Sequence, residues 1–171
     1  DPATAIRELT SVLAEDPGLL MARRSLAVAY TAARQHARAI AELRRVEKEA
    51  GLSAEDAIVL GDNLRFAGRL DESMAVLEKA AKENPRFAQP WLSIAEVQVK
   101  KGRLAEAAAA YEHVLSITPD QVEALRGLGD LALLQQKLDA AGARYARLLE
   151  VAPADAGGLS KLGVVRMRTG R

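Results

Sequence analysis

The residues best able to do chemistry are two histidines and a glycine pair. His36 and His113 are the only histidines, cysteine is absent, and neither histidine has a partner at a metal-ligand or catalytic-triad spacing. Gly127 and Gly129, within LRGLGDLA, match part of a nucleotide-binding loop but lie in a helical stretch without a preceding strand. We therefore predict no enzyme activity, no metal and no cofactor, and interpret both histidines as partly exposed turn residues.

The charges of the chain almost cancel. Lys and Arg together number 24 and Asp and Glu 23, which gives a net charge of +1. Such a balance provides no field to concentrate nucleic acid or an anionic membrane, and no apolar run approaches the roughly 20 residues of a membrane span. We predict a soluble chain with no nucleic-acid partner and no membrane insertion. The absence of cysteine leaves the compartment open, with the cytoplasm as the default.

The composition favours helices. Ala, Leu, Arg and Glu dominate, only 4% of the residues are aromatic, and few segments collect the β-branched and aromatic residues that strands require. We predict an all-α fold. The high content of Ala and Arg indicates a bacterial source with a GC-rich genome.

A period of 34 residues runs through the chain. Pro17, Pro85, Pro119 and Pro153 are separated by multiples of 34 residues, and Gly51 fills the missing place. The period defines a single repeat domain over residues 1–171, with full repeats at 20–53, 54–87, 88–121 and 122–155 and half-repeats at 1–19 and 156–171.

Residue size also repeats. The seventh position of each repeat is large and the eighth is small, as in Leu26-Ala27, Leu60-Gly61, Ile94-Ala95, Leu128-Gly129 and Leu162-Gly163. A small eighth residue lets the second helix of a hairpin approach closely, while its large neighbours interlock around it. A larger residue there should splay the hairpin.

Glycine and proline mark the helix ends. Gly68 and Gly102 begin two Gly-Arg-Leu turns, where glycine can adopt the left-handed conformation that ends a helix. Together with the size pattern, these residues resemble the tetratricopeptide repeat family. Repeat 88–121 matches best, with Trp91, Ile94, Ala95, Gly102, Ala107, Tyr111 and Pro119 in the family's positions. Departures include Arg23 and Ala57 at the large fourth position, Arg34 and Gln136 at the turn glycine, and Gln98 at an apolar position.

The resemblance implies an α-solenoid of stacked antiparallel helix hairpins. We expect ten helices of about 13 to 15 residues, paired in sequence and winding to the right. The nearest confusable family, the pentatricopeptide repeats, would imply single-stranded RNA. It favours a 35-residue period and lacks this proline column, so we set it aside.

The resemblance also implies a groove that binds a protein or extended peptide. In that family the concave face is lined by positions two, five, six, nine, twelve and thirteen of each first helix. The ninth position places carboxylates at Asp62, Glu96 and Asp130, which should favour a basic segment. The groove candidates are Glu55, Ile58, Asp62, Arg65, Gln89, Leu92, Glu96, Lys100, Glu123, Arg126, Asp130 and Leu133.

One variant of the family clamps a C-terminal carboxylate with Lys, Asn and Arg. Arg24 is present in the first full repeat, but Val28, Val59, Gln89 and Ser93 occupy places where that clamp needs other residues. We therefore do not expect binding of chaperone tails.

Two alternatives concern the ends of the chain. The half-repeats suggest a fragment of a larger protein, in which these repeats would assemble or position a multidomain enzyme. The final half-repeat also presents an apolar stripe, Leu159, Leu162 and Val165, without a following helix to cover it. An exposed stripe of this kind predicts self-association through the end helix.

Overall fold

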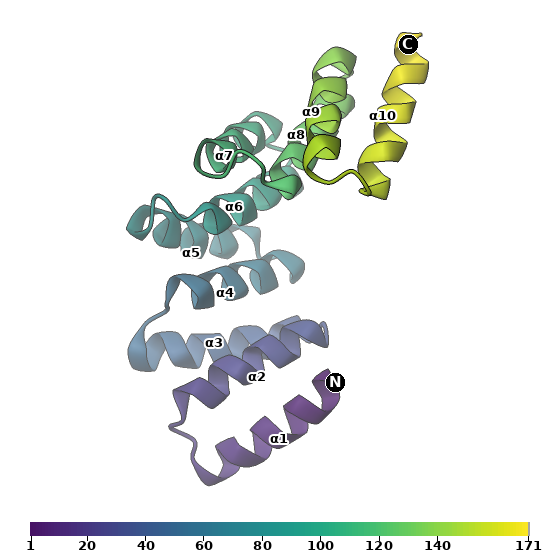
Figure 1. The fold of residues 1–171 in the computed structure, drawn as a ribbon. Coiled ribbons are helices and arrows are strands. Elements are labelled where there is room, and N and C mark those ends of the chain that lie inside the picture. Colours follow the sequence, from purple (N-terminus) through teal and green to yellow (C-terminus); the bar gives the residue numbers. More distant parts are fainter. Residues whose placement is uncertain (171) are drawn as a thin grey trace. The chain divides into compact units, whose positions relative to one another are not determined.

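The computed structural model describes residues 1–170, which form helices joined by short turns and contain no strand (Figure 1). The helices span 13 to 15 residues, which confirms the all-α prediction. None of the helices described is long and apolar enough to cross a membrane. Their bounds are α1 (Pro2–Glu15), α2 (Leu20–Ala32), α3 (His36–Ala50), α4 (Ala54–Phe66), α5 (Leu70–Glu83), α6 (Ala88–Lys100), α7 (Leu104–Ile117), α8 (Val122–Leu134), α9 (Leu138–Val151) and α10 (Ala156–Thr169).

Helix starts follow the repeat. The first helices of the hairpins begin 34 residues apart, at Leu20, Ala54, Ala88, Val122 and Ala156. The second helices show the same spacing, at Pro2, His36, Leu70, Leu104 and Leu138. One unit of sequence therefore encodes one helix pair, as predicted.

A left-handed residue stands in each three-residue turn within a hairpin. Gly68 and Gly102 have φ angles of 78° and 72°, which confirms the role expected of the turn glycines. Arg34 and Gln136 adopt the same conformation, at 57° and 58°, although both carry a side chain. In each turn the next N–H donates to a carbonyl five residues back, as from Arg69 N to Leu64 O at 2.9 Å.

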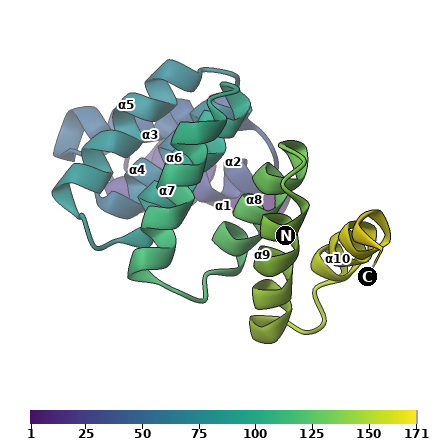
Figure 2. The same cartoon turned by 90° about the horizontal axis from the view of Figure 1, so that it is seen from above.

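The chain divides into two compact units, each described by itself. Unit 1 covers residues 1–85 and contains α1 to α5, while unit 2 begins at Arg86 and contains α6 to α10. In unit 2, α9 lies next to both α8 and α10 (Figure 2). A core cluster of unit 1 comprises Ala27, Ile40, Leu43, Leu60 and Leu64, and one of unit 2 comprises Ala141, Tyr145 and Val165. The single repeat domain over residues 1–171 stays a prediction.

Small residues at the eighth position allow close helix contacts. A Cβ added at Gly61 would lie 2.6 Å from Leu77 Cγ, and one added at Gly129 would lie 2.7 Å from Tyr145 Cε1. By contrast, a Cβ at Gly163 would meet nothing within 4 Å. The small residue is therefore required only where a second helix packs on the first.

The apolar stripe on α10 is not uncovered, contrary to our expectation. Val165 is only 4% exposed and packs with Ala141 and Tyr145 of α9, and Leu162 is partly buried against the same cluster. Leu159 alone remains exposed, at 53%. The prediction was wrong for Leu162 and Val165 because α10 turns this face toward the preceding helix, α9.

Candidate peptide-binding surface

In unit 1, four groove candidates lie along α4. Glu55 is exposed in the first turn, and Ile58, Asp62 and Arg65 follow as partly buried residues. Arg65 Nη2 lies 3.4 Å from Asp62 Oδ1, one turn away on the same helix. The Asp62 carboxylate therefore has a cation beside it and is not an isolated negative charge.

Phe66 ends α4 as a large exposed aromatic residue. Its ring is stacked on His36, with centroids 5.0 Å apart, and the Arg65 guanidinium lies 4.3 Å from its centroid. Phe66 is nevertheless 52% exposed. Our candidate set omitted it, although it stands at position thirteen of its repeat, one of the positions assigned to the groove.

A buried amide holds this cluster in place. Asn63 is fully buried, and its Nδ2 donates to Thr31 Oγ1 and to the Val59 carbonyl, both at 2.7 Å. Its Oδ1 lies 2.9 Å from His36 Nδ1. His36 is thus a partly buried residue at the start of α3 that contacts α4, close to the turn role predicted for it.

In unit 2, α6 carries four further candidates. Gln89 and Glu96 are partly buried, and Lys100 is exposed at the last turn. Leu92 is only 5% exposed. Its burial argues against the role of apolar partner contact that we assigned to it, because a core residue offers almost no surface to a ligand.

Asp130 on α8 is held by two other helices. Its Oδ1 accepts hydrogen bonds from the Tyr145 hydroxyl on α9 and from Lys161 Nζ on α10, each at 2.5 Å. Burial, the hydrogen bond to Asp130 and its negative charge raise the pKa of Tyr145 well above its ordinary value. Asp130 therefore links α8 to α9 and α10, and the Lys161 ammonium group neutralises its negative charge.

Arg126, another candidate on α8, is paired with the start of α10. Arg126 Nη2 lies 2.5 Å from Asp155 Oδ2, while Asp155 Oδ1 caps α10 by accepting from Gly158 N at 2.6 Å. The exposed Glu123 accepts a hydrogen bond from Gln121 Nε2 at 2.9 Å. These polar candidates therefore have intramolecular partners.

Leu133 and the exposed Leu134 border a surface hollow at the end of α8. The hollow has a volume of about 420 Å³, and Lys161 and Arg168 of α10 also line it. Leu134 is 66% exposed, while Leu133 packs partly against the Tyr145 cluster. This end of unit 2 combines aliphatic surface with two cations.

His113 differs from its prediction. It lies within α7 instead of a turn, and its ring contacts Trp91 of α6 with centroids 4.3 Å apart. The prediction was wrong because the helix continues through this position and packs the imidazole against α6. Among the residues described, no three His, Cys, Asp or Glu side chains gather as metal ligands.

Exposed apolar side chains concentrate at the groove positions. Ten large apolar residues are exposed among the residues described, and six of them stand at positions two, nine, twelve or thirteen of a first helix. These six are Met21, Val28, Phe66, Val99, Leu134 and Met167. The six groove positions make up less than a fifth of a 34-residue repeat, so in each unit these positions carry more exposed large apolar residues than chance would place there.

Solved structures show the same fold. MamA is 24% identical, with a TM-score of 0.79 over 91% of this chain and 91% of that chain. TTC0263, a thermophilic protein in Thermus thermophilus, is 24% identical, with a TM-score of 0.78 over 97% of this chain and 91% of that chain. YrrB, described as a TPR protein with an unusual peptide-binding site, is 14% identical, with a TM-score of 0.74 over 93% and 82%.

No curated protein sequence matches the chain. Two family models, each described as tetratricopeptide repeat, match residues 58–122 and 99–160. Together these matches span residues 58–160, more than half of the chain, and they agree with the 34-residue helix pairs and the left-handed turns. The chain belongs to the tetratricopeptide repeat family.

Proposed function

We propose that the chain is a binding scaffold without catalytic activity, which takes up an extended segment of a partner protein on its first-helix faces. The concentration of exposed apolar side chains at the groove positions carries this proposal. Apolar patches bordered by charged groups are typical of protein interaction sites. The printed description of YrrB as a peptide-binding TPR protein supports the same class of function.

The paired charges favour a mostly apolar segment with few charges. Asp62 lies beside Arg65, and Asp130 binds Lys161, so neither carboxylate needs a partner's cation for neutralisation. A preference for basic segments therefore depends chiefly on the exposed carboxylates Glu55 and Glu123. We retain it as a secondary feature of the proposal.

Substitution of the exposed apolar residues tests the proposal. The variant Phe66→Ser with Val28→Ser removes apolar surface from unit 1, and Leu134→Ser removes it from unit 2. Chemical cross-linking identifies the partners that bind the wild-type chain, and these partners should be lost from the variants. Burial of each large apolar side chain contributes about 1.5 to 3 kcal/mol to the free energy of binding. A control variant, Leu19→Ser with Phe87→Ser, removes exposed apolar surface outside the groove positions and should retain the partners.

A second pair of variants tests the preference for basic segments. Glu55→Gln and Glu123→Gln remove negative charge from the first-helix faces of units 1 and 2 without adding bulk. A basic partner should bind them more weakly, and the loss of affinity should shrink as the salt concentration is raised.

The proposed site would be contradicted if the apolar variants and their control, Leu19→Ser with Phe87→Ser, lost the same partners to the same extent.

A further inference from the structure

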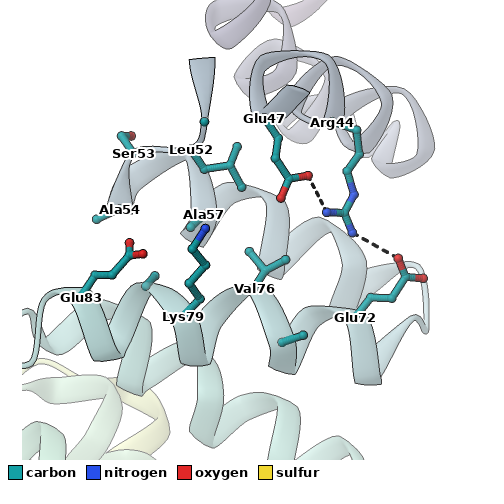
Figure 3. A pocket seen from close by; sticks show the side chains of 13 residues that line it. Arg44, Glu47, Leu52, Ser53, Ala54, Ala57, Glu72, Val76, Lys79 and Glu83 are labelled. Atoms are coloured by element: carbon teal, nitrogen blue, oxygen red, sulfur yellow. Dashed lines mark hydrogen bonds and ion pairs between the residues drawn. The ribbon is translucent and has the colours of Figure 1, made fainter. Parts of the chain in front are cut away.

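The second-helix side of unit 1 contains a furrow that none of the groove candidates lines. Its walls are α3 and α5, and the beginning of α4 with the preceding loop forms its floor (Figure 3). Its volume is about 350 Å³. The furrow is therefore a surface separate from the one proposed above.

The inner surface of the furrow, formed by α5 as well as by the α4 segment, is apolar and continuous with the core. Leu52 and Val76 pack against the core cluster of unit 1, and Ala57 and Ala80 are 5% and 3% exposed. Side chains that are anchored in a core present a preformed surface, so a ligand would not have to order them.

Most charged groups around the furrow are paired with one another. Arg44 contacts Glu47 at 2.7 Å and Glu72 at 3.2 Å, and the second contact links α3 to α5 (Figure 3). Glu72 also accepts from Arg69 at 2.7 Å, and this hydrogen bond lowers the pKa of Glu72. These charges leave little net attraction for a ligand.

Lys79 and Glu83 are different. Among the residues described, neither takes part in an ion pair, although they stand one turn apart on α5. Lys79 extends from α5 toward Ala57, whereas the Glu83 carboxylate lies on the side of Ala54 (Figure 3). The furrow therefore offers a cation above an apolar floor.

The equivalent furrow in unit 2 shows what such a cation binds. Arg147 stands two repeats after Lys79, and Asp120 stands two repeats after Leu52. Arg147 Nη2 lies 2.5 Å from Asp120 Oδ1, and Arg147 Nη1 lies 2.7 Å from Glu150 Oε2 on the same helix. In unit 2 the chain supplies two carboxylates to this cation, and in unit 1 Leu52 and Lys82 stand in their places.

We propose that this furrow binds an acidic residue flanked by aliphatic side chains in an extended segment of a partner protein. The ligand's carboxylate would meet Lys79 as Asp120 meets Arg147, and its aliphatic neighbours would cover Leu52 and Val76. Glu83 weakens the interaction by repulsion. The two binding surfaces thus differ in the segment they favour: the first-helix faces favour a mostly apolar segment, and the furrow favours one with an acidic residue.

A pair of blocked peptides tests the proposal. The probe is acetyl-Ala-Leu-Glu-Leu-Ala-amide, and its control replaces Glu with Gln. Titration into ¹⁵N-labelled wild-type chain should shift the amide signals of residues 52–57 and 76–83. The Gln peptide should bind about 1.5- to 5-fold more weakly, the range for one exposed ion pair.

Single substitutions on α5 assign the effect to Lys79. Lys79→Gln should reduce binding of the Glu peptide to that of the Gln peptide, and Glu83→Gln should increase it. Lys82→Gln removes the same charge from an exposed residue outside the furrow and should change neither affinity. Leu52→Asp reproduces the residue of unit 2 and should abolish binding, provided that circular dichroism shows a folded chain.

The proposal would be overturned by no shifts at the furrow with several millimolar peptide, by equal affinities for the two peptides, or by equal losses from Lys79→Gln and Lys82→Gln. Shifts confined to α2 and α4 groove positions would also overturn it, since they would assign the peptide to the first-helix face. The Phe66→Ser variant should retain furrow binding, so the two proposals fail independently.

Discussion

Single residues depart from the family pattern without changing the backbone. Arg34 and Gln136 occupy the turn position that Gly68 and Gly102 hold in the other hairpins, and all four have positive φ angles. A side chain makes this conformation costly because its Cβ approaches the following carbonyl. The hairpins therefore impose a conformation that Arg34 and Gln136 do not favour by themselves.

Replacement of these residues by glycine should stabilise the chain. We expect Arg34→Gly and Gln136→Gly each to raise the free energy of unfolding by about 0.5 to 1 kcal/mol, because relief of strain outweighs the added freedom of the unfolded chain. Gly68→Ala should lower it by about 1 kcal/mol, although an added Cβ meets nothing within 4 Å. Urea unfolding measures the free energy of unfolding of all three variants. A lower stability of Arg34→Gly would contradict the inference that the positive φ angle strains the backbone at Arg34.

Helices pair through size complementarity at the eighth position. Gly129 on α8 faces the fully buried Tyr145 on α9, whose hydroxyl binds Asp130. Gly163 has the same place in α10 but faces open space. The two glycines are therefore a matched pair for testing the packing rule.

Gly129→Ala should destabilise the α8–α9 hairpin. The added methyl group would overlap the Tyr145 ring, at a cost of about 1 to 3 kcal/mol. Gly163→Ala should instead be neutral or stabilise α10 by up to about 1 kcal/mol, since alanine is the better helix former. Thermal unfolding distinguishes the two, and equal effects would show that the eighth position does not control helix approach.

The beginning of α10 depends on Asp155, and its contribution should vary with pH. The hydrogen bond from Gly158 N and the contact with Arg126 lower the pKa of Asp155 below its ordinary value of 3.8. The pKa of Asp155 is lower in the folded chain than in the unfolded chain. The stabilisation is therefore present above pH 3.8 and is lost as the pH falls through the folded pKa. Asp155→Ala should therefore reduce the melting temperature at pH 7 more than at pH 2. A difference independent of pH would contradict this assignment.

At the scale of the whole molecule, each unit has its own core. Leu60 and Leu64 belong to the cluster of unit 1, while Tyr145 and Val165 belong to that of unit 2. Repeat proteins gain stability from contacts between neighbouring helices, so stability can differ along the chain.

A core substitution in unit 1 should act locally. Leu64→Ala removes a fully buried side chain and should cost about 2 to 5 kcal/mol. Hydrogen exchange should accelerate in α2 to α5, with little change in α8 to α10. Equal acceleration throughout the chain would show that residues 1–170 unfold as one cooperative unit.

The sequence by itself determined the helices, the hairpins and the family. These features depend on residue types at fixed spacing, such as the large-small pair Leu60-Gly61 and the turn glycines. Each feature involves residues within one repeat, and local packing demands the same side-chain sizes each time. For this reason the repeat can be recognised from the sequence alone.

Only the tertiary structure decided which side chains remain available to a partner. Asp130 was predicted as a groove carboxylate, but Lys161 from α10 binds it, and Leu92 proved to be buried. Lys79 was not predicted, and its counterpart Arg147 is paired with Asp120 and Glu150, in whose places unit 1 has Leu52 and Lys82. Ion pairing and burial depend on side chains from several helices meeting in space, and a periodic pattern along one chain does not specify those meetings.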